Sequence, residues 1–183
     1  MLYHVSPIPG LRELKPAVSG HEKPYVYAID NLAAALLFGA PKDDFDILMD
    51  ADELGKAVVW ECYPNALERI DKGKACSVYT VSEEGFSRGL TGWAPEWVSE
   101  SIVPVLEETR VADLYSRLMT EKSSGALIVH SYSRSADYRH FVEEELGERL
   151  TQWNLLEHFE KKDPRAKLYF QELIRRMKEK NNS

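Results

Sequence analysis

Short apolar runs separated by turn residues dominate the first part of the chain. Runs of this length, with alternating or continuous apolar positions, are typical of β-strands. They occupy residues 1–5, 26–29, 56–62, 75–81, 97–101, 103–111 and 126–131. Lys72 and Gly73 lie between two of these runs, so we expect 56–62 and 75–81 to pair as an antiparallel hairpin. Residues 43–53 alternate too poorly to decide between a loop and a short strand.

Helical spacing of apolar residues is found at 31–38 and 113–121 within this strand-rich part. Asp30 stands directly before the first of these helices. Its side-chain oxygen can accept from the free backbone donors of the first turn, so we expect it to be the cap. Residues 11–14 are expected to form a single helical turn, and the polar stretch 17–23 to form a loop.

The pattern changes after residue 131, where two long helices are predicted. Ser135 can cap a helix over residues 136–160. Asp163 followed by Pro164 is a strong start signal for a second helix, because proline is favoured at the first helical position. This second helix is expected to end near Lys180.

The chain is therefore expected to be a mixed α+β protein with a strand-rich domain at 1–133 and a helical hairpin at 134–183 packed on it. The last helix combines an apolar stripe with a basic surface. The stripe contains Leu168, Phe170, Leu173, Ile174 and Met177, and the basic residues are Lys167, Arg175, Arg176, Lys178 and Lys180. Such a helix usually has a solvated face over a packed stripe; the alternative is a docking element for a partner protein or nucleic acid.

Composition and charge narrow the function classes. The 183 residues suit one domain, with or without an appendage. A net charge of −7 disfavours nonspecific nucleic-acid binding by the chain as a whole. No run approaches the ~18 apolar residues of a membrane span, and no secretory signal is visible, so a cytoplasmic protein is expected. Cys62 and Cys76 fit neither a disulfide framework nor a metal-ligand spacing, so we expect reduced core thiols and no metal site.

Three short motifs in a fixed order resemble a known fold. They are Leu-Tyr-His-Val-Ser (2–6), Val-Tyr-Ala-Ile-Asp (26–30) leading into three alanines, and Glu-Trp-Val-Ser with a later Val-Pro (96–104). Together they resemble the ADP-ribosyltransferase-like fold in its His-Tyr-Glu branch. This branch includes diphtheria-toxin-like enzymes, poly(ADP-ribose) polymerases and RNA 2′-phosphotransferases. The resemblance covers roughly residues 1–131 and implies a split, mostly antiparallel β core.

The resemblance also implies roles for single residues. His4 matches the histidine that hydrogen-bonds a hydroxyl of the nicotinamide-side ribose of NAD⁺, and Tyr27 matches the tyrosine that stacks on the nicotinamide. A second aromatic ring is expected from either Tyr79 or Phe38. Glu96 matches the catalytic glutamate that holds the ribose 2′-hydroxyl. A carboxylate there stabilises the positive charge that builds on the ribose more in the transition state than in the ground state.

The implied activity is NAD-dependent transfer of ADP-ribose to an unknown protein or nucleic-acid acceptor, or hydrolysis of NAD⁺. Glu100 competes with Glu96 for the catalytic role, because it lies on the same face of an extended strand by the period of two. Val5 stands where many members have glycine, which favours the alternative of a noncatalytic binding module that acts through the cleft or the helical tail. RNA 2′-phosphate transfer is disfavoured, since no set of arginines clusters near His4 in the sequence.

Overall fold

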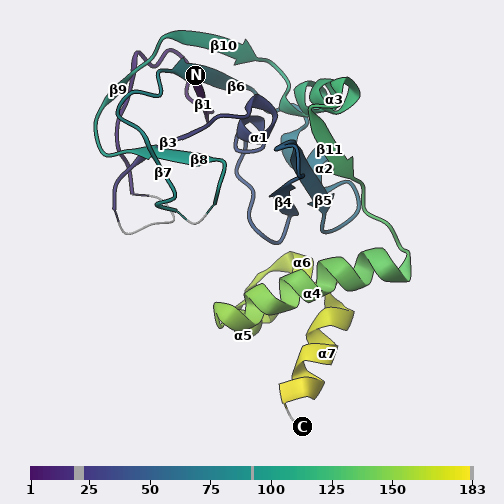
Figure 1. The fold of residues 1–183 in the computed structure, drawn as a ribbon. Coiled ribbons are helices and arrows are strands. Elements are labelled where there is room, and N and C mark those ends of the chain that lie inside the picture. The colour runs from purple at the N-terminus through teal and green to yellow at the C-terminus, as the bar shows by residue number, and fades with distance from the viewer. Residues whose placement is uncertain (19–22, 92, 182–183) are drawn as a thin grey trace. The chain divides into compact units, whose positions relative to one another are not determined.

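The computed structural model describes residues 1–18, 23–91 and 93–181, so Gly92 and most of the predicted loop at 17–23 lie outside it. The protein is mixed α+β, with antiparallel sheets and several C-terminal helices (Figure 1). In chain order the elements are β1 (Leu2–Ser6), β2 (Glu13–Leu14), β3 (Val26–Ile29), α1 (Leu32–Leu36), β4 (Ile47–Ala51), β5 (Ala57–Glu61), α2 (Ala66–Asp71), β6 (Cys76–Val81), β7 (Ser87–Arg88), β8 (Glu96–Ser99), β9 (Val103–Pro104), β10 (Glu107–Val111), α3 (Leu114–Ser124), β11 (Leu127–His130), α4 (Ala136–Gln152), α5 (Leu156–Lys162), α6 (Pro164–Leu168) and α7 (Gln171–Asn181).

Within the described residues, the strands form three sheets. The largest has six strands in the order β10-β6-β1-β3-β8-β7, and its pairs are antiparallel. A three-stranded sheet has the order β11-β5-β4, and β2 pairs with β9. The chain order and the spatial order thus differ strongly, and β1 lies near the middle of the large sheet.

Contacts between residues divide the chain into two compact units. Unit 1 comprises 1–42, 49–59 and 67–130, and unit 2 comprises 43–48, 60–66 and 131–183. The sequence placed a boundary at 133/134, close to the last of these divisions. It assigned the two short segments of unit 2, 43–48 and 60–66, to the first domain.

One hydrophobic cluster of unit 1 lies between the large sheet and the β2–β9 pair. Its buried members are Leu2, Leu14, Val26, Ala28, Tyr79, Val81 and Val103. Alternation along β1, β3 and β6 places their core residues on one face of the sheet, which is the face that β2 and β9 cover. Helix α1 contacts β1 and β3, and its residues 33–36 are buried. Cys76 and, in unit 2, Cys62 are buried free thiols, as expected.

Three local predictions are wrong. The runs 56–62 and 75–81 do not form a hairpin, since β5 and β6 belong to different sheets and the residues between them form α2, whose Ala66 and Leu67 are buried. The predicted helical turn at 11–14 contains the strand β2, which pairs with β9.

The predicted cap of α1 is also displaced by one residue. Asn31 accepts from the Ala34 N–H at 3.1 Å and is the N-cap. Asp30 instead binds the Arg88 guanidinium and accepts from Trp97 Nε1 at 3.2 Å. The undecided segment at 43–53 contains β4.

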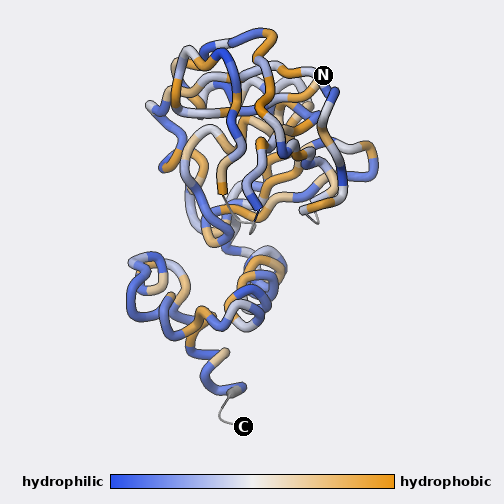
Figure 2. Tube along the Cα trace, turned by 90° about the vertical axis from the view of Figure 1, so that its left-hand side faces the viewer, coloured by the Kyte–Doolittle hydropathy of each residue, from blue (hydrophilic) through white to orange (hydrophobic). Residues whose placement is uncertain are grey.

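The described residues of unit 2 form four helices where two were predicted. Ser135 and Asp163 cap α4 and α6 as expected, and Pro164 lies in the first turn. The first predicted helix breaks after Gln152, where Asn154 has a left-handed backbone (φ 53°). The last helix, α7, is largely hydrophilic in Figure 2, in agreement with its many charged residues.

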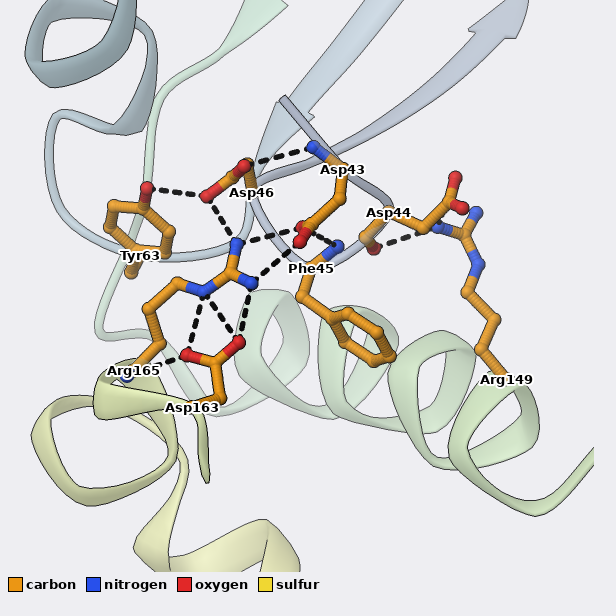
Figure 3. A network of polar contacts seen from close by, with 8 residues as sticks. All are labelled: Asp43, Asp44, Phe45, Asp46, Tyr63, Arg149, Asp163 and Arg165. Atoms are coloured by element: carbon orange, nitrogen blue, oxygen red, sulfur yellow. Dashed lines mark hydrogen bonds and ion pairs between the residues drawn. The ribbon is translucent and has the colours of Figure 1, made fainter. Parts of the chain in front are cut away.

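A polar network around one guanidinium joins the three segments of unit 2 (Figure 3). Arg165 donates to Asp43 Oδ1 at 2.7 Å, to Asp46 Oδ1 at 2.5 Å and to Asp163 Oδ2 at 2.5 Å. The Tyr63 hydroxyl donates to Asp46 Oδ1 at 2.7 Å. Burial alone opposes the charge on Arg165, but the bonds to the three carboxylates raise its pKa. The network therefore holds 43–46 and 63 against the start of α6.

None of the helices in the described part of the chain combines the length and the apolar composition that crossing a bilayer requires.

Candidate functional site

The candidate residues of the first part of the chain come from three neighbouring strands. His4 lies on β1, Tyr27 on β3 and Glu96 on β8, and these strands are consecutive in the large sheet. Segments far apart in the sequence are thus brought side by side by antiparallel pairing. Ile29 of β3 is opposite Tyr3 on one side and Glu96 on the other.

The sheet opens between β1 and β3 just beyond this point. Tyr3 is opposite Ile29, but Tyr25, four residues earlier on the same chain, is opposite Ala17. The imidazole of His4 lies in this opening, with its Nδ1 2.8 Å from the carbonyl oxygen of Tyr27. A side chain therefore links the two strands where the backbone ladder between them ends.

This hydrogen bond defines the proton positions of His4. A carbonyl oxygen only accepts, so Nδ1 carries the hydrogen and donates. Burial lowers the pKa of His4, and the bond to Tyr27 offsets this only in part. The neutral ring therefore carries its one proton on Nδ1, and Nε2 has a free lone pair that can accept from a ligand hydroxyl.

A pocket of about 550 Å³ lies at this opening. Its lining residues are His4, Gly10, Leu11, Arg12, Glu13, Leu14, Lys15, Ala17, Tyr25, Val26 and Tyr27. The Tyr25 and Tyr27 rings meet edge to face, with 6.0 Å between centroids. Arg12 is exposed on the wall, and Lys15 Nζ lies 3.2 Å from Glu13. Aromatic rings, a neutral imidazole and two cations suit a ligand that combines a flat ring, hydroxyls and an anionic group.

Glu96 lies beside Tyr27 rather than beside His4. Tyr27 is opposite Val98, so Tyr27 and Glu96 are diagonal neighbours on the same face of the sheet. Burial raises the pKa of the Tyr27 hydroxyl, and the negative charge of Glu96 raises it further. Glu96 does not belong to the described residues that line the pocket.

His4 points to the other face of the sheet, because it is opposite Tyr79 while its neighbour Tyr3 is opposite Ile29. Tyr27 therefore links the other two residues, His4 and Glu96. Its carbonyl oxygen binds His4, and its hydroxyl end is close to the charge of Glu96. The structure brings the three residues together in two pairs and not on a single wall.

The two candidates for a second aromatic ring lie in different surroundings. Tyr79 is fully buried, and its hydroxyl donates to the Ile8 carbonyl oxygen at 2.6 Å and accepts from the Leu11 N–H at 3.2 Å. Its ring supports the pocket wall from within the core. Phe38 is 44% exposed and packs against Trp93, with 5.7 Å between ring centroids.

Glu100 does not lie on the extended strand. β8 ends at Ser99, and the Glu100 side chain is 68% exposed and 3.8 Å from Lys23 Nζ. Val5, for which the resemblance would often have glycine, is opposite Val78 and is not among the described residues of the pocket lining. Glu100 and Val5 are therefore both outside the described residues that line the pocket.

Of the residues that line the pocket, sequence reasoning proposed His4 and Tyr27, and it missed the rest, among them the cations Arg12 and Lys15 and the ring of Tyr25. Arg12 and Lys15 stand directly before and after β2, and the sequence assigned 11–14 to a helical turn. Tyr25 could have been found from the period of two, since it precedes Tyr27 by two residues in the same extended run.

Comparison of the chain with family models, with curated proteins and with solved structures found no match. Within residues 1–18, 23–91 and 93–181, no three His, Cys, Asp or Glu side chains are grouped as a metal ion would require. The geometry of the pocket and the resemblance of the three motifs are therefore what bear on the function of the protein.

Proposed function

We propose that the protein binds NAD⁺ in the pocket between β1 and β3 and transfers ADP-ribose to a protein or nucleic-acid acceptor, or to water. The observation that carries this proposal is the 2.8 Å link from His4 to Tyr27 inside a pocket whose wall includes two cations. The order of β1, β3 and β8 in one antiparallel sheet supports an ADP-ribosyltransferase-like fold, because it makes neighbours of the strands that carry the three motifs.

Three chemical parts of NAD⁺ have a proposed counterpart at the pocket. The ring of Tyr27 is partly exposed on the face opposite His4, where the buried Tyr25 meets it edge to face, and it offers an aromatic surface for a nicotinamide that reaches through the gap between β1 and β3. The free lone pair of His4 Nε2 is suited to accept from a ribose hydroxyl. Arg12 and Lys15 offer charge-assisted hydrogen bonds to the pyrophosphate.

In the proposed reaction the bond between the nicotinamide nitrogen and C1′ of the ribose breaks, and nicotinamide leaves with the bonding electron pair. An oxygen or nitrogen of the acceptor then forms a bond to C1′ and loses its proton. Positive charge on the ribose is largest between these two events. The carboxylate of Glu96, close to the Tyr27 hydroxyl, is the group proposed to stabilise that charge.

Release of nicotinamide from NAD⁺ by the purified protein tests the proposal. Glu96→Gln keeps the shape of the side chain and removes its charge, and we expect turnover to fall by at least about a hundredfold while NAD⁺ still binds. Glu100→Gln is the matched control and should keep the wild-type rate, because Glu100 is exposed beyond the end of β8. Equal rates for wild type and Glu96→Gln would remove Glu96 from the mechanism.

A noncatalytic binding module is the second candidate, and the position of Glu96 outside the pocket lining favours it. The two candidates differ in a simple experiment. A ligand that binds only the folded state raises the melting temperature with its concentration. A shift with NAD⁺ and no release of nicotinamide would support the binding module, whereas no shift at millimolar NAD⁺ would contradict NAD⁺ as the ligand.

A further inference from the structure

The segment after β1 lines one side of the pocket, and two side chains of the sheet form hydrogen bonds with its backbone. The Gly10 N–H donates to both carboxylate oxygens of Glu108, at 3.1 and 3.2 Å. The Leu11 N–H donates to the Tyr79 hydroxyl, which in turn donates to the Ile8 carbonyl oxygen. Residues 8–11 are thus held at both ends of a short turn, directly before Arg12.

These side chains form a row across the sheet. His4 on β1 is opposite Tyr79 on β6, and Tyr79 is opposite Glu108 on β10. Residues opposite each other in antiparallel strands point to the same face, so the wall is folded over the face that also bears His4. The spacing of the strands therefore determines where the turn lies relative to the His4 imidazole.

Glu108 is itself held in place. The Ser77 hydroxyl donates to Glu108 Oε1 at 2.6 Å, and Arg110 Nε lies 3.3 Å from the same oxygen. Hydrogen bonds from Ser77 and Gly10 lower the pKa of Glu108, so the side chain is ionised at neutral pH. Gly10 has a left-handed backbone (φ 76°), which turns the chain so that its N–H faces the carboxylate.

We propose that Glu108 is a positioning residue for the ligand pocket, which holds the turn at Gly10 so that Arg12 faces the anionic part of the ligand. The inference rests on the proposed binding of NAD⁺ in this pocket. Glu108 is not among the residues described as lining the pocket, so its effect on the ligand is transmitted through the backbone of residues 10–12.

Three variants separate positioning from general stability. Glu108→Ala removes both acceptors, and Glu108→Asp keeps the charge but shortens the side chain by one methylene. Glu108→Gln keeps one carbonyl oxygen that can accept from the Gly10 N–H. Glu107→Ala, an exposed glutamate of the same strand, is the matched control.

Two measurements are made on every variant. Hydrogen exchange reports whether the amides of residues 8–12 open more readily, and titration with NAD⁺ reports the dissociation constant. We expect Glu108→Ala and Glu108→Asp to speed exchange in this segment and to raise the dissociation constant by about tenfold or more. Glu108→Gln should stay within about threefold of the wild type, and Glu107→Ala should match it. Where nicotinamide is released, KM should rise and kcat should change by less than about twofold, because the wall contacts substrate and transition state alike.

The outcomes distinguish this inference from the proposed function. If the wild type binds NAD⁺ and Glu108→Ala binds it equally well, Glu108 has no positioning role and the NAD⁺ pocket stands. If the wild type does not bind NAD⁺, the proposed function fails and this inference fails with it. If Glu108→Ala does not fold, Glu108→Asp and Glu108→Gln are compared instead. The turn should be loosened in Glu108→Asp and kept in Glu108→Gln, so equal dissociation constants for these two variants would contradict the positioning role.

Discussion

Replacing Arg165 with methionine tests how far unit 2 depends on one guanidinium. Methionine keeps the apolar part of the side chain, so the change removes the charge and the donors with little loss of volume. The carboxylates of Asp43, Asp46 and Asp163 then lose their shared cation. Tyr63 continues to donate to Asp46, but three negative charges repel one another in a small space (Figure 3).

The size of the effect follows from burial. The Arg165, Asp46 and Asp163 side chains are 18%, 10% and 17% exposed, whereas Asp43 is 52% exposed. Removing one partner of a buried ion pair costs about 3–5 kcal/mol. Because water reaches Asp43 and partly screens the others, we expect the lower end, about 3 kcal/mol of the unfolding free energy. This is a large share of the stability of an ordinary domain.

The effect depends on pH in a defined direction. Burial alone would raise the pKa of Asp43, but the hydrogen bond from Arg165 holds it below the ordinary value of 3.8. A carboxyl with a lowered folded pKa contributes stability above its unfolded pKa and loses it as the pH falls through the folded value. In Arg165→Met the three carboxylates repel one another, so protonation of a carboxylate stabilises the variant instead. The difference between variant and wild type should therefore shrink as the pH falls from about 5 through the ordinary value of 3.8.

Urea denaturation followed by circular dichroism measures the change, and hydrogen exchange shows whether 43–46 and α6 lose protection. Arg175→Met is the matched control, because Arg175 pairs with Glu172 and Glu179 at the surface of α7 and its loss should leave the denaturation midpoint unchanged. A loss below about 1 kcal/mol for Arg165→Met would refute the reasoning, since that is the range of ordinary substitutions.

Three changes in unit 1 test other parts of the structure. Lys42→Met removes the cation 2.6 Å from the fully buried carboxylate of Asp71 and should lower the unfolding free energy by about 3–5 kcal/mol in urea; an unchanged midpoint would contradict this. Gly39→Ala places a methyl 2.8 Å from Leu114 Cδ2 and should cost about 1–3 kcal/mol in thermal unfolding, unless the leucine rotates freely. His4 has a lowered folded pKa, so wild-type stability should fall as the pH drops below the ordinary value of 6.5; the slope of Tm against pH should flatten in His4→Gln.

The sequence predicted local structure better than it predicted partners. Caps such as Ser135 and Asp163 are set by contacts within three residues, so they were found correctly. The hairpin of 56–62 and 75–81 failed because periodicity shows that a segment is a strand and not which strand it pairs with. The break of the first C-terminal helix at Asn154 was missed for a different reason. Asparagine adopts the left-handed backbone more readily than most residues, so Asn154 was a local signal for a helix end, but the apolar periodicity continues past it.

The same distinction applies to the site. His4, Tyr27 and Glu96 were chosen for their order along the chain, and the sheet does place their strands next to one another. Arg12 and Lys15 were missed because their place in the pocket depends on the pairing of β2 with β9 and on the fastening of Gly10 by Glu108. Both are contacts between residues about ninety to a hundred positions apart, so no short window of sequence contains them.

The register of the sheet places the proposed binding residue His4 and the proposed catalytic residue Glu96 on opposite faces. His4 and Glu96 point to opposite faces, and Tyr27 stands between them at the opening of the sheet. A ligand that contacts both His4 and Glu96 must therefore enter the gap between β1 and β3, whereas a ligand that contacts only the pocket wall need not reach Glu96. Changes at His4 should weaken binding in either case, and changes at Glu96 should alter turnover only if the ligand reaches through the gap. The two residues thus report separately on whether the pocket is a binding site alone or the entrance to a catalytic one.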